Sequence, residues 1–329
     1  MRPRVLSVSA TAALALAAIA MPGSAFAQEA SPSLVPTEDI EAAGATRLTV
    51  MPFADWVVTT DGSAWVAVGE AVTQLDGGDG AELASVPIPG ETCLAMDVGF
   101  DSIWVGACRM DAPSLVRIDP ATATVVATIP LPIRDLQGES SVAAGEGAVW
   151  AVDDGSVEQL LIKVDPQTEA VVGTFPLPAG LSGVRAGLGG VWVAKTNADS
   201  VLHIDPTDGS ILSEIAVGVR PRFLAVGEGA VWAMNEGDGT VSRIDPATDS
   251  VTATIVVATR PVQGGDIAVG GGSVWARISD QLVARIDPAS NEVVARFGPP
   301  AGSGSVAADD EAAWISAHDI NVVFRLPLE

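Results

Sequence analysis

The fold is decided by the stretch VGEGAVWAMNEGDGTVSRIDPATDSVTATIV, which runs from Val226 to Val256. Its central phrase, built around Trp232, recurs along the chain at Trp65, Trp104, Trp150, Trp192, Trp275 and Trp314. Successive tryptophans are 39, 46, 42, 40, 43 and 39 residues apart. Self-similarity at a fixed period of this size indicates a repeat architecture, in which each copy is one structural unit. The chain is therefore predicted to contain seven copies of one unit.

Each copy contains four short apolar runs separated by turn residues, a pattern that favours β-strands over helices. In the quoted copy the runs, which we name A to D in order, are Arg222–Val226, Ala230–Met234, Val241–Ile244 and Thr252–Val256. Two-residue loops such as Glu228-Gly229 favour tight hairpins between A and B. Asp-Pro-x-Thr/Ser phrases favour type I turns between C and D, so their aspartates are interpreted as turn caps rather than metal ligands: Asp119, Asp165, Asp245 and Asp287. A period of roughly 40–45 residues with four strands predicts an all-β fold, a seven-bladed β-propeller of four-stranded antiparallel blades.

The two ends of the chain predict how the ring closes. The last copy has an A run (Ser305–Ala308), a B run (Ala312–Ser316) and a C run (Asn321–Leu326), but no D run before Glu329. The stretch Thr46–Pro52 resembles the D run Val125–Pro130. We therefore expect the N-terminal strand to complete the last blade, which removes the exposed edges of an open array.

The first residues have the pattern of a secretory signal peptide. Arg2 and Arg4 precede an apolar run that ends in Ala25-Phe26-Ala27, an A-x-A cleavage pattern. The expected organisation is a signal peptide over 1–27, a flexible lead-in over 28–45 and a propeller over 46–329. The mature chain is expected to be exported, in a secreted, cell-envelope or periplasmic location, with no membrane span and as a monomer.

The charge of the chain disfavours polyanionic partners. The sequence has 17 basic and 41 acidic residues, a net charge of −24, and loss of Arg2 and Arg4 with the signal peptide makes it −26. Nucleic acid carries one negative charge per phosphate and binds basic surfaces, so no nucleic-acid partner is expected.

The phrases Gly227-Glu-Gly-Ala-Val-Trp232 and Arg243-Ile-Asp-Pro-Ala-Thr248 resemble those of bacterial YVTN-type and virginiamycin B lyase-like (streptogramin lyase-like) seven-bladed propellers, over essentially the whole mature chain. The resemblance implies, as one alternative, metal-assisted elimination on a cyclic depsipeptide, with a histidine base, Mg²⁺ and carboxylates at the channel mouth. Those lyases carry Trp-Phe-Thr-Glu in their repeats. Here the residue three positions after each tryptophan is Val68, Ala107, Asp153, Lys195, Asn235, Ile278 or Ala317, so that glutamate is absent.

The chain has only two histidines. His203 takes the position of the Arg or Lys in strand C of other blades, which indicates a structural substitute. His318 follows Trp314-Ile-Ser-Ala in a loop and is the one candidate catalytic residue. No G-x-S-x-G, H-E-x-x-H or phosphate-binding loop motif is present. No cofactor or metal is expected, apart from Mg²⁺ under the lyase alternative.

Two charged residues and two cysteines depart from the repeat. Position seven before each tryptophan is small or apolar in most copies, but it is Asp97 in the second and Arg185 in the fourth. With a two-residue A–B loop, this position pairs directly with the tryptophan, so Arg185 either stacks on Trp192 or, with Asp97, projects into the central channel. With Phe100-Asp101 as the loop, Cys93 and Cys108 face each other and are predicted to form a disulfide, the default state in an exported protein.

The function expected from these features is that of a ligand-binding or protein-interaction module. In a propeller the D–A and B–C loops share one face, and here those loops have varied polar content, whereas the A–B and C–D turns are stereotyped. Rigid scaffolds usually carry their binding residues on such loops. The partner expected is a small molecule, a peptide or an envelope protein, and the candidate residues are Arg109, Arg134, Asp153, Asp154, Lys195, Asn197, Arg222, Asn235, Glu236, Arg260, His318 and Asp319.

Overall fold

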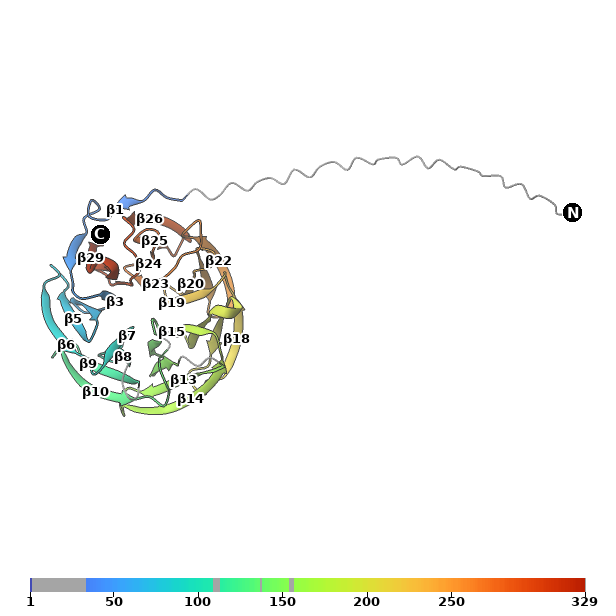
Figure 1. Cartoon of the computed structure of the whole chain (residues 1–329), viewed down its shortest axis with the longest axis horizontal. Helices are drawn as coiled ribbons and strands as arrows, with labels where there is room; N and C mark the ends of the chain where they lie inside the picture. Colours follow the sequence, from blue (N-terminus) through green and yellow to red (C-terminus); the bar gives the residue numbers. More distant parts are fainter. Residues whose placement is uncertain (2–33, 109–112, 137, 154–156, 329) are drawn as a thin grey trace. The chain divides into compact units, whose positions relative to one another are not determined.

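The computed structural model describes Met1 and residues 34–108, 113–136, 138–153 and 157–328. Seven antiparallel sheets follow one another in chain order around a ring, with strand A of each blade innermost (Figure 1). The predicted seven-bladed all-β propeller is confirmed. The predicted signal peptide falls outside the described residues, apart from Met1. No helix in the described ranges is long and apolar enough to cross a membrane.

The strands of the seven blades have the following bounds. Blade one contains β3 (Ala54–Thr60), β4 (Ser63–Val68), β5 (Ala71–Asp76) and β6 (Glu82–Pro87). Blade two contains β7 (Glu91–Gly99), β8 (Ser102–Cys108), β9 (Ser114–Asp119) and β10 (Thr124–Pro130). Blade three contains β11 (Val142–Gly145), β12 (Ala148–Val152), β13 (Glu158–Asp165) and β14 (Ala170–Pro178). Blades four and five contain β15 (Leu181–Gly187), β16 (Gly190–Lys195), β17 (Ser200–Ile204) and β18 (Ile211–Ala216), then β19 (Pro221–Gly227), β20 (Ala230–Asn235), β21 (Thr240–Asp245) and β22 (Ser250–Val256). Blade six contains β23 (Gly265–Gly270), β24 (Ser273–Ile278), β25 (Val283–Asp287) and β26 (Glu292–Gly298). Blade seven contains β27 (Val306–Ala308), β28 (Ala312–Ala317), β29 (Val322–Pro327) and β2 (Thr46–Thr49).

The ring closes through the N-terminal strand, as predicted. Strand β2 runs antiparallel to β29, with Thr46 opposite Arg325 and Thr49 opposite Val322. A second contact, in the stretch 28–45, is not predicted by any pattern in the sequence. There β1 (Glu38–Asp39) adds a parallel strand to β26 of blade six, and the following Ile40 is fully buried. Two separate blades therefore bind the N-terminal segment.

The recurrent tryptophan has the same environment in every blade. It lies in strand B, is at most 1% exposed, and pairs with the strand A residue seven positions earlier, as in Ala225 opposite Trp232. In blades two to six its indole Nε1 donates to the backbone oxygen five residues before it, as from Trp232 to Gly227 at 3.1 Å. A large buried ring with a satisfied polar atom anchors the interior of each blade.

A basic residue on strand C covers each of six tryptophans. Five of these residues also bind the next blade, whereas Arg285 donates to Ser273 of its own blade. Arg117, Lys163, Arg243, Arg285 and Arg325 lie 5.2–5.7 Å from the ring centroids of the facing tryptophans. His203 stacks on Trp192 at 3.9 Å and pairs with Asp249 of the next blade, which confirms its interpretation as a structural substitute. Stacking of Arg185 on Trp192 is not among the ring contacts of the described residues, because its guanidinium donates instead to Ser140 Oγ and the Val184 backbone oxygen.

The hairpin of blade two contains the predicted disulfide. Phe100 and Asp101 have φ of 55° and 54°, the left-handed values that tight hairpin loops require. The register is as expected at Asp97, which faces Trp104, but it shifts between Thr92 and Met96. Cys108 therefore pairs with Glu91 rather than with Cys93. The Cys93 and Cys108 Cα atoms still lie 5.3 Å apart and the two residues are disulfide-bonded.

Candidate functional site

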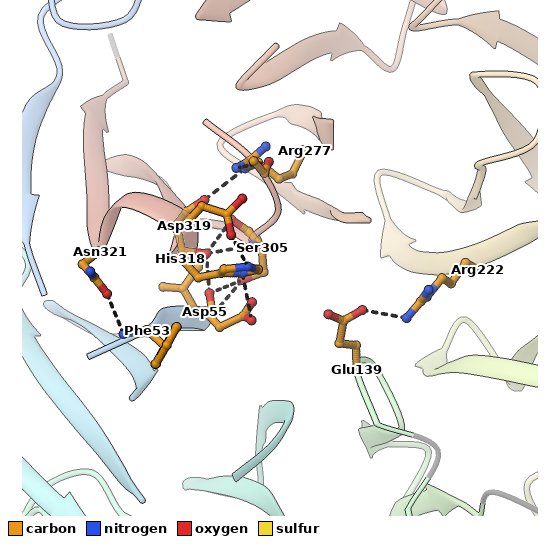
Figure 2. Close-up of polar contacts among 12 residues, drawn as sticks. Phe53, Asp55, Glu139, Arg222, Arg277, Ser305, His318, Asp319 and Asn321 are labelled. Atoms are coloured by element: carbon orange, nitrogen blue, oxygen red, sulfur yellow. Dashed lines mark hydrogen bonds and ion pairs between the residues drawn. The ribbon is translucent and has the colours of Figure 1, made fainter. Parts of the chain in front are cut away.

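The candidate site lies on the face formed by the D–A and B–C loops, which we call the loop face; the A–B and C–D turns form the opposite turn face. At the centre of the loop face, around the channel mouth, lie the ionisable side chains of blades one, three, five and seven (Figure 2). We call Asp55, Glu139, Arg222, Glu236 and His318 the mouth cluster.

His318 lies between two carboxylates. It begins the 3₁₀ turn η2 (His318–Ile320) directly after strand β28. Its Nδ1 lies 3.2 Å from Oδ2 of Asp55, which belongs to blade one, and its Nε2 lies 2.7 Å from Oδ1 of Asp319 (Figure 2). The Asp55 carboxylate raises the pKa of His318 above its usual value, and burial opposes this increase. An imidazolium held by two carboxylates is the arrangement that this geometry favours.

Buried polar groups of blades six and seven position this pair. The hydroxyl groups of Ser305 and Ser316 both donate to the backbone oxygen of Asp55, which attaches blade one to blade seven. Arg277 is fully buried and donates to the backbone oxygens of Ser316, Ile278 and Gly302 at 2.9–3.0 Å. Burial lowers the pKa of Arg277 to about 10, so the guanidinium stays charged at neutral pH. The loop between β26 and β27 is thereby fixed against η2.

An ion pair crosses to another part of the mouth. Nη2 of Arg222, in blade five, lies 2.8 Å from Oε2 of Glu139, in the loop that precedes blade three (Figure 2). Burial raises the pKa of Glu139; the attraction of Arg222 opposes the increase, and Asp55 and Glu236 reinforce it. The mouth therefore concentrates negative charge that Arg222 and His318 neutralise in part.

A pocket adjoins the mouth between blades four and five. It has a volume of about 490 Å³ and is lined by Gly180, Leu181, Ser182, Thr196, Asn197, Arg220, Arg222 and Glu236. Glu236 is 1% exposed, accepts from the backbone N–H of Gly264 and pairs with Arg220 at 3.5 Å. The Arg220 and Arg222 side chains are 54% and 39% exposed, so both guanidinium groups remain accessible.

The structure brings together only some of the sequence-derived candidates. Asn197, Arg222 and Glu236 line the pocket, and His318 and Asp319 lie at the mouth. Asp153 and Asn235 are buried and form hydrogen bonds within their own blades. Asp153 accepts from the Leu160 backbone N–H, and the Asn235 side-chain amide donates to the hydroxyl groups of Thr240 and Ser242. Lys195 pairs with Glu214 and Arg260 with Asp280, and neither residue lines the pocket. Arg134 is exposed, while Arg109 and Asp154 lie outside the described residues.

Several residues of the site were missed by the sequence analysis. Asp55 and Asp266 are charged residues at the starts of innermost strands whose neighbours are apolar, and Trp56 is the eighth tryptophan, outside the repeated phrase. A charged residue in an innermost strand is the feature that identified Asp97 and Arg185 in the sequence. The same feature could have identified Asp55 and Asp266. Glu139 has no such signal, because its loop has no counterpart in the repeat.

The donor set does not fit the Mg²⁺ of the lyase alternative. In the described part of the chain, no group of three or more His, Cys, Asp or Glu residues is placed to bind a metal ion. Octahedral Mg²⁺ requires oxygen ligands at close range, and at the mouth His318 itself occupies the space between Asp55 and Asp319.

Comparison with known proteins adds to the fold assignment. No protein-family model and no curated protein matches the chain. Among solved structures, "Structure of U3-55K" is 12% identical at a TM-score of 0.73 and covers 87% of this chain and 99% of that one. "Crystal structure of RRP9 WD40 repeats" is 12% identical at a TM-score of 0.73 and covers 88% of this chain and 98% of that one. The Pan2 WD40 domain of Neurospora crassa is 11% identical at a TM-score of 0.66 and covers 91% of this chain and 98% of that one. Two of these three titles name WD40 repeats or a WD40 domain. At such identities the likeness shows the seven-bladed propeller fold alone.

Proposed function

We propose that this protein is an exported binding module whose loop face recognises a peptide or small ligand carrying a carboxylate group. The propeller fold is consistent with a protein-interaction module. The observation that carries the proposal is the pocket with Arg220 and Arg222, two accessible guanidinium groups on a protein of net charge −24. Basic side chains gathered at one concave site of an acidic protein indicate an anionic group as the ligand.

The chemistry of arginine supports a carboxylate. A guanidinium presents a planar set of donors that binds a carboxylate through two parallel hydrogen bonds. The 3.5 Å separation between Arg220 and Glu236 is too long for a strong hydrogen bond, so Arg220 retains donors for a ligand. Arg222 is already oriented by Glu139 and lies 5.1 Å from the Phe223 ring, which reduces the entropy cost of ordering it on binding.

An exposed aromatic side chain on the same face suits a peptide or protein partner. Phe53 is 65% exposed in the loop before β3, and its backbone N–H donates to Oδ1 of Asn321 at 2.7 Å (Figure 2). Exposed aromatic residues at a defined position are typical anchors of interaction surfaces. Phe53 would contact an apolar residue of a ligand whose carboxylate lies in the pocket.

The binding proposal is tested with a library of short peptides offered in pairs, with a free or an amidated C-terminus, and fluorescence polarisation as the measurement. We expect binding of free-acid peptides to the mature protein, and weakening by about tenfold in Arg220→Ala or Arg222→Ala. Arg260→Ala is the matched control, because it removes an exposed arginine of the same face outside the pocket. Equal binding of the free and amidated series would rule out the carboxylate.

Export is tested separately. The A-x-A pattern ending at Ala27 leads us to propose cleavage before Gln28. The mature protein recovered from the culture fluid or the cell envelope of a bacterial host should begin at Gln28 by intact mass. An uncleaved chain retained in the cytoplasm would contradict it.

One observation favours a second candidate function, the lyase-like elimination. His318 meets Asp55 from a neighbouring blade, and a histidine oriented by a carboxylate is the arrangement of a general base. Both ring nitrogens face carboxylates, so a base role requires Asp319, whose side chain is 55% exposed, to swing away. Incubation with virginiamycin B, followed by chromatography for the linear product, tests this function. Activity that His318→Asn abolishes would support it, whereas no product under any metal condition would contradict it.

A further inference from the structure

The central channel contains a second cavity, distinct from the loop-face pocket. Its volume is about 290 Å³, and the innermost strands of all seven blades line it. Three of the lining residues are ionisable: Asp97 on β7, Arg185 on β15 and Asp266 on β23. Asp97 and Arg185 therefore do project into the channel.

Trp56 lines this cavity and spans the channel. It reaches from β3 of blade one to Phe223 on β19 of blade five, with ring centroids 6.3 Å apart, and its Nε1 donates to the backbone oxygen of Met96 at 3.1 Å. Blades one and five are not neighbours, so this contact crosses the channel. Trp56 is 2% exposed.

Two of the three ionisable residues are satisfied by the protein itself. Asp97 accepts from the backbone N–H groups of Val98 and Ala144 at 2.9 and 2.8 Å. Nη1 of Arg185 donates to Ser140 Oγ and to the Val184 backbone oxygen, both at 2.9 Å. Their opposite charges attract each other across the cavity. Burial raises the pKa of Asp97, and the attraction of Arg185 opposes this increase.

Asp266 is less well satisfied, although Arg185 and its cross-strand neighbour Arg277 attract it. It is 2% exposed, its Oδ2 accepts from the Val306 N–H at 3.3 Å, and its Oδ1 has no hydrogen-bond partner among the described residues. No ion pair joins Arg185 to either aspartate in the described ranges. A buried carboxylate oxygen without a partner is costly, and proteins usually supply a counter-charge or a donor. The ionised carboxylate therefore lacks a donor at Oδ1, and its nearest cations, Arg185 and Arg277, attract it without forming an ion pair in the described ranges.

The access route to the cavity is acidic. Thr59 and Val98 line both the channel cavity and a groove of about 950 Å³ on the turn face. The acidic residues of that groove are Asp61, Asp101, Asp119, Asp309, Asp310 and Glu311. Clefts lined by charge of one sign raise the local concentration of the opposite ion. The groove would thus concentrate cations at the turn-face end of the channel.

We propose that the channel cavity binds the primary ammonium group of a small ligand, which donates a hydrogen bond to Oδ1 of Asp266. An ammonium supplies the donor that Oδ1 lacks, together with a positive charge that stabilises the ionised carboxylate. A chelated divalent cation fits less well, because no group of three or more ligating side chains is present in the described residues. This site is independent of the loop-face pocket, so either proposal can fail alone.

The charges around Asp266 predict how pH affects this binding. Burial raises the pKa of Asp266 to about 7, the attraction of Arg185 opposes the increase, and Glu139 reinforces it. Arg277 on β24, whose pKa of about 10 keeps it charged in this range, and Asp97 on β7, whose pKa is also raised by burial, are the other ionisable groups near the cavity. An ammonium binds the ionised carboxylate, so its affinity should increase as pH rises from about 6 to about 8.

The test is a titration of the mature protein with methylammonium chloride, followed by the amide NMR signals of Val306 and Ile267 at constant ionic strength. We expect saturable shifts in the wild type and loss of saturation, or affinity about tenfold lower, in Asp266→Asn. The variant should remain folded, since it removes an unpaired buried charge, and its melting curve verifies this. Asp245→Asn, which changes a carboxylate of a distant C–D turn, is the matched control and should bind as the wild type does.

Parallel titrations with potassium chloride and tetramethylammonium chloride identify the class of cation. Neither should reproduce the saturable shifts, because one lacks a hydrogen-bond donor and the other lacks both a donor and a compact charge. Saturation by potassium at similar concentrations would overturn the ammonium assignment in favour of an alkali cation. Saturable methylammonium binding that persists unchanged in Asp266→Asn would overturn the site itself.

Discussion

Arg243 of strand β21 donates a 2.8 Å hydrogen bond from Nη1 to the backbone oxygen of Pro288, in the C–D turn of the next blade. The same guanidinium lies 5.2 Å from the Trp232 ring centroid. The equivalent residues Arg117 and Lys163 reach Pro166 and Pro206 in the same way. The Arg-Ile-Asp-Pro phrase thus serves two purposes, because its arginine joins a blade to the next and its Asp-Pro turn receives the arginine from the previous one.

Substitution of this residue should weaken the contact between blades five and six. Arg243→Ala removes the stacking on Trp232 and the hydrogen bonds to Pro288 and Asn291. We expect a loss of about 2 kcal/mol in the free energy of unfolding, since hydrogen bonds from charged groups and cation–π contacts each contribute about 1 kcal/mol or more. Urea denaturation followed by tryptophan fluorescence measures it. Arg134→Ala, at an exposed position, is the control and should change stability by less than about 0.5 kcal/mol.

The N-terminal segment should stabilise the ring at two separate points. Deletion of residues 28–52 removes β2 from blade seven and exposes the edge of β29, so we expect poor solubility or a large fall in melting temperature. Deletion of 28–44 keeps β2 but removes Ile40, whose full burial contributes about 1.5–3 kcal/mol, and should cause a smaller fall. Deletion of 28–36 spares both contacts. Equal melting temperatures for the three deletion variants would contradict the expected order of stability, in which the 28–36 deletion is the most stable and the 28–52 deletion the least.

The sequence predicted the propeller closely because each feature of a blade has a local cause. The tryptophan, the A–B loop and the Asp-Pro turn recur at fixed spacing, and hairpin pairing follows from loop length, so even the pairing of Asp97 with Trp104 and Arg185 with Trp192 could be predicted. The register around Cys93 could not, because the bulge between Thr92 and Met96 is not encoded in loop length. The pairing of β1 with β26 was not predicted either, because a two-residue strand is too short to show an alternation of apolar and polar residues.

The candidate site was less predictable, because it depends on contacts between blades. The sequence identified His318, but its partner Asp55 lies in another blade, far from it in the sequence. Arg222 and Glu139 are likewise brought together only by ring closure. Lys195 and Arg260 looked equivalent to Arg222 in sequence, yet only Arg222 of the three lines the pocket. The local sequence determines which residues lie in loops. The closure of the ring determines which of those loop residues come together.

The disulfide should contribute modestly to stability. It closes a sequence separation of 15 residues between adjacent strands, for which the chain-entropy model gives roughly 3 kcal/mol or less. We expect Cys93→Ser/Cys108→Ser to remain folded with a lower melting temperature. Intact mass of the wild type, purified from an oxidising compartment and alkylated without reductant, should show no labelled thiol. Two labelled thiols would show that the bond does not form in the cell.

His318 should titrate above the ordinary range for histidine. Asp55 raises its pKa, so the ion pair contributes stability that is fully present below the unfolded pKa of about 6.5 and is lost as pH rises through the folded value. The stability difference between the wild type and His318→Asn should therefore be largest at acidic pH and decrease above neutrality. Asp55→Asn should lower the His318 pKa, measured from its ring proton signals by NMR. A His318 pKa that is unchanged by Asp55→Asn would show that the two residues do not interact.

Asp266 should make the protein less stable as pH rises. Burial raises its folded pKa to about 7, whereas in the unfolded chain its pKa lies near 3.8, the usual value for an aspartate. Between these two values the folded state binds one more proton than the unfolded state, so stability falls with increasing pH, by at most about 1.4 kcal/mol per pH unit. Asp266→Asn abolishes this dependence. We expect the variant to gain stability relative to the wild type from about pH 4 to about pH 7 and to keep a constant advantage above that. Urea unfolding of both proteins at several pH values measures the difference, in which the contributions of other titrating groups largely cancel. A difference that stays constant from pH 4 to pH 8 would mean that Asp266 has a normal pKa in the fold, and that its carboxylate already has a counter-charge.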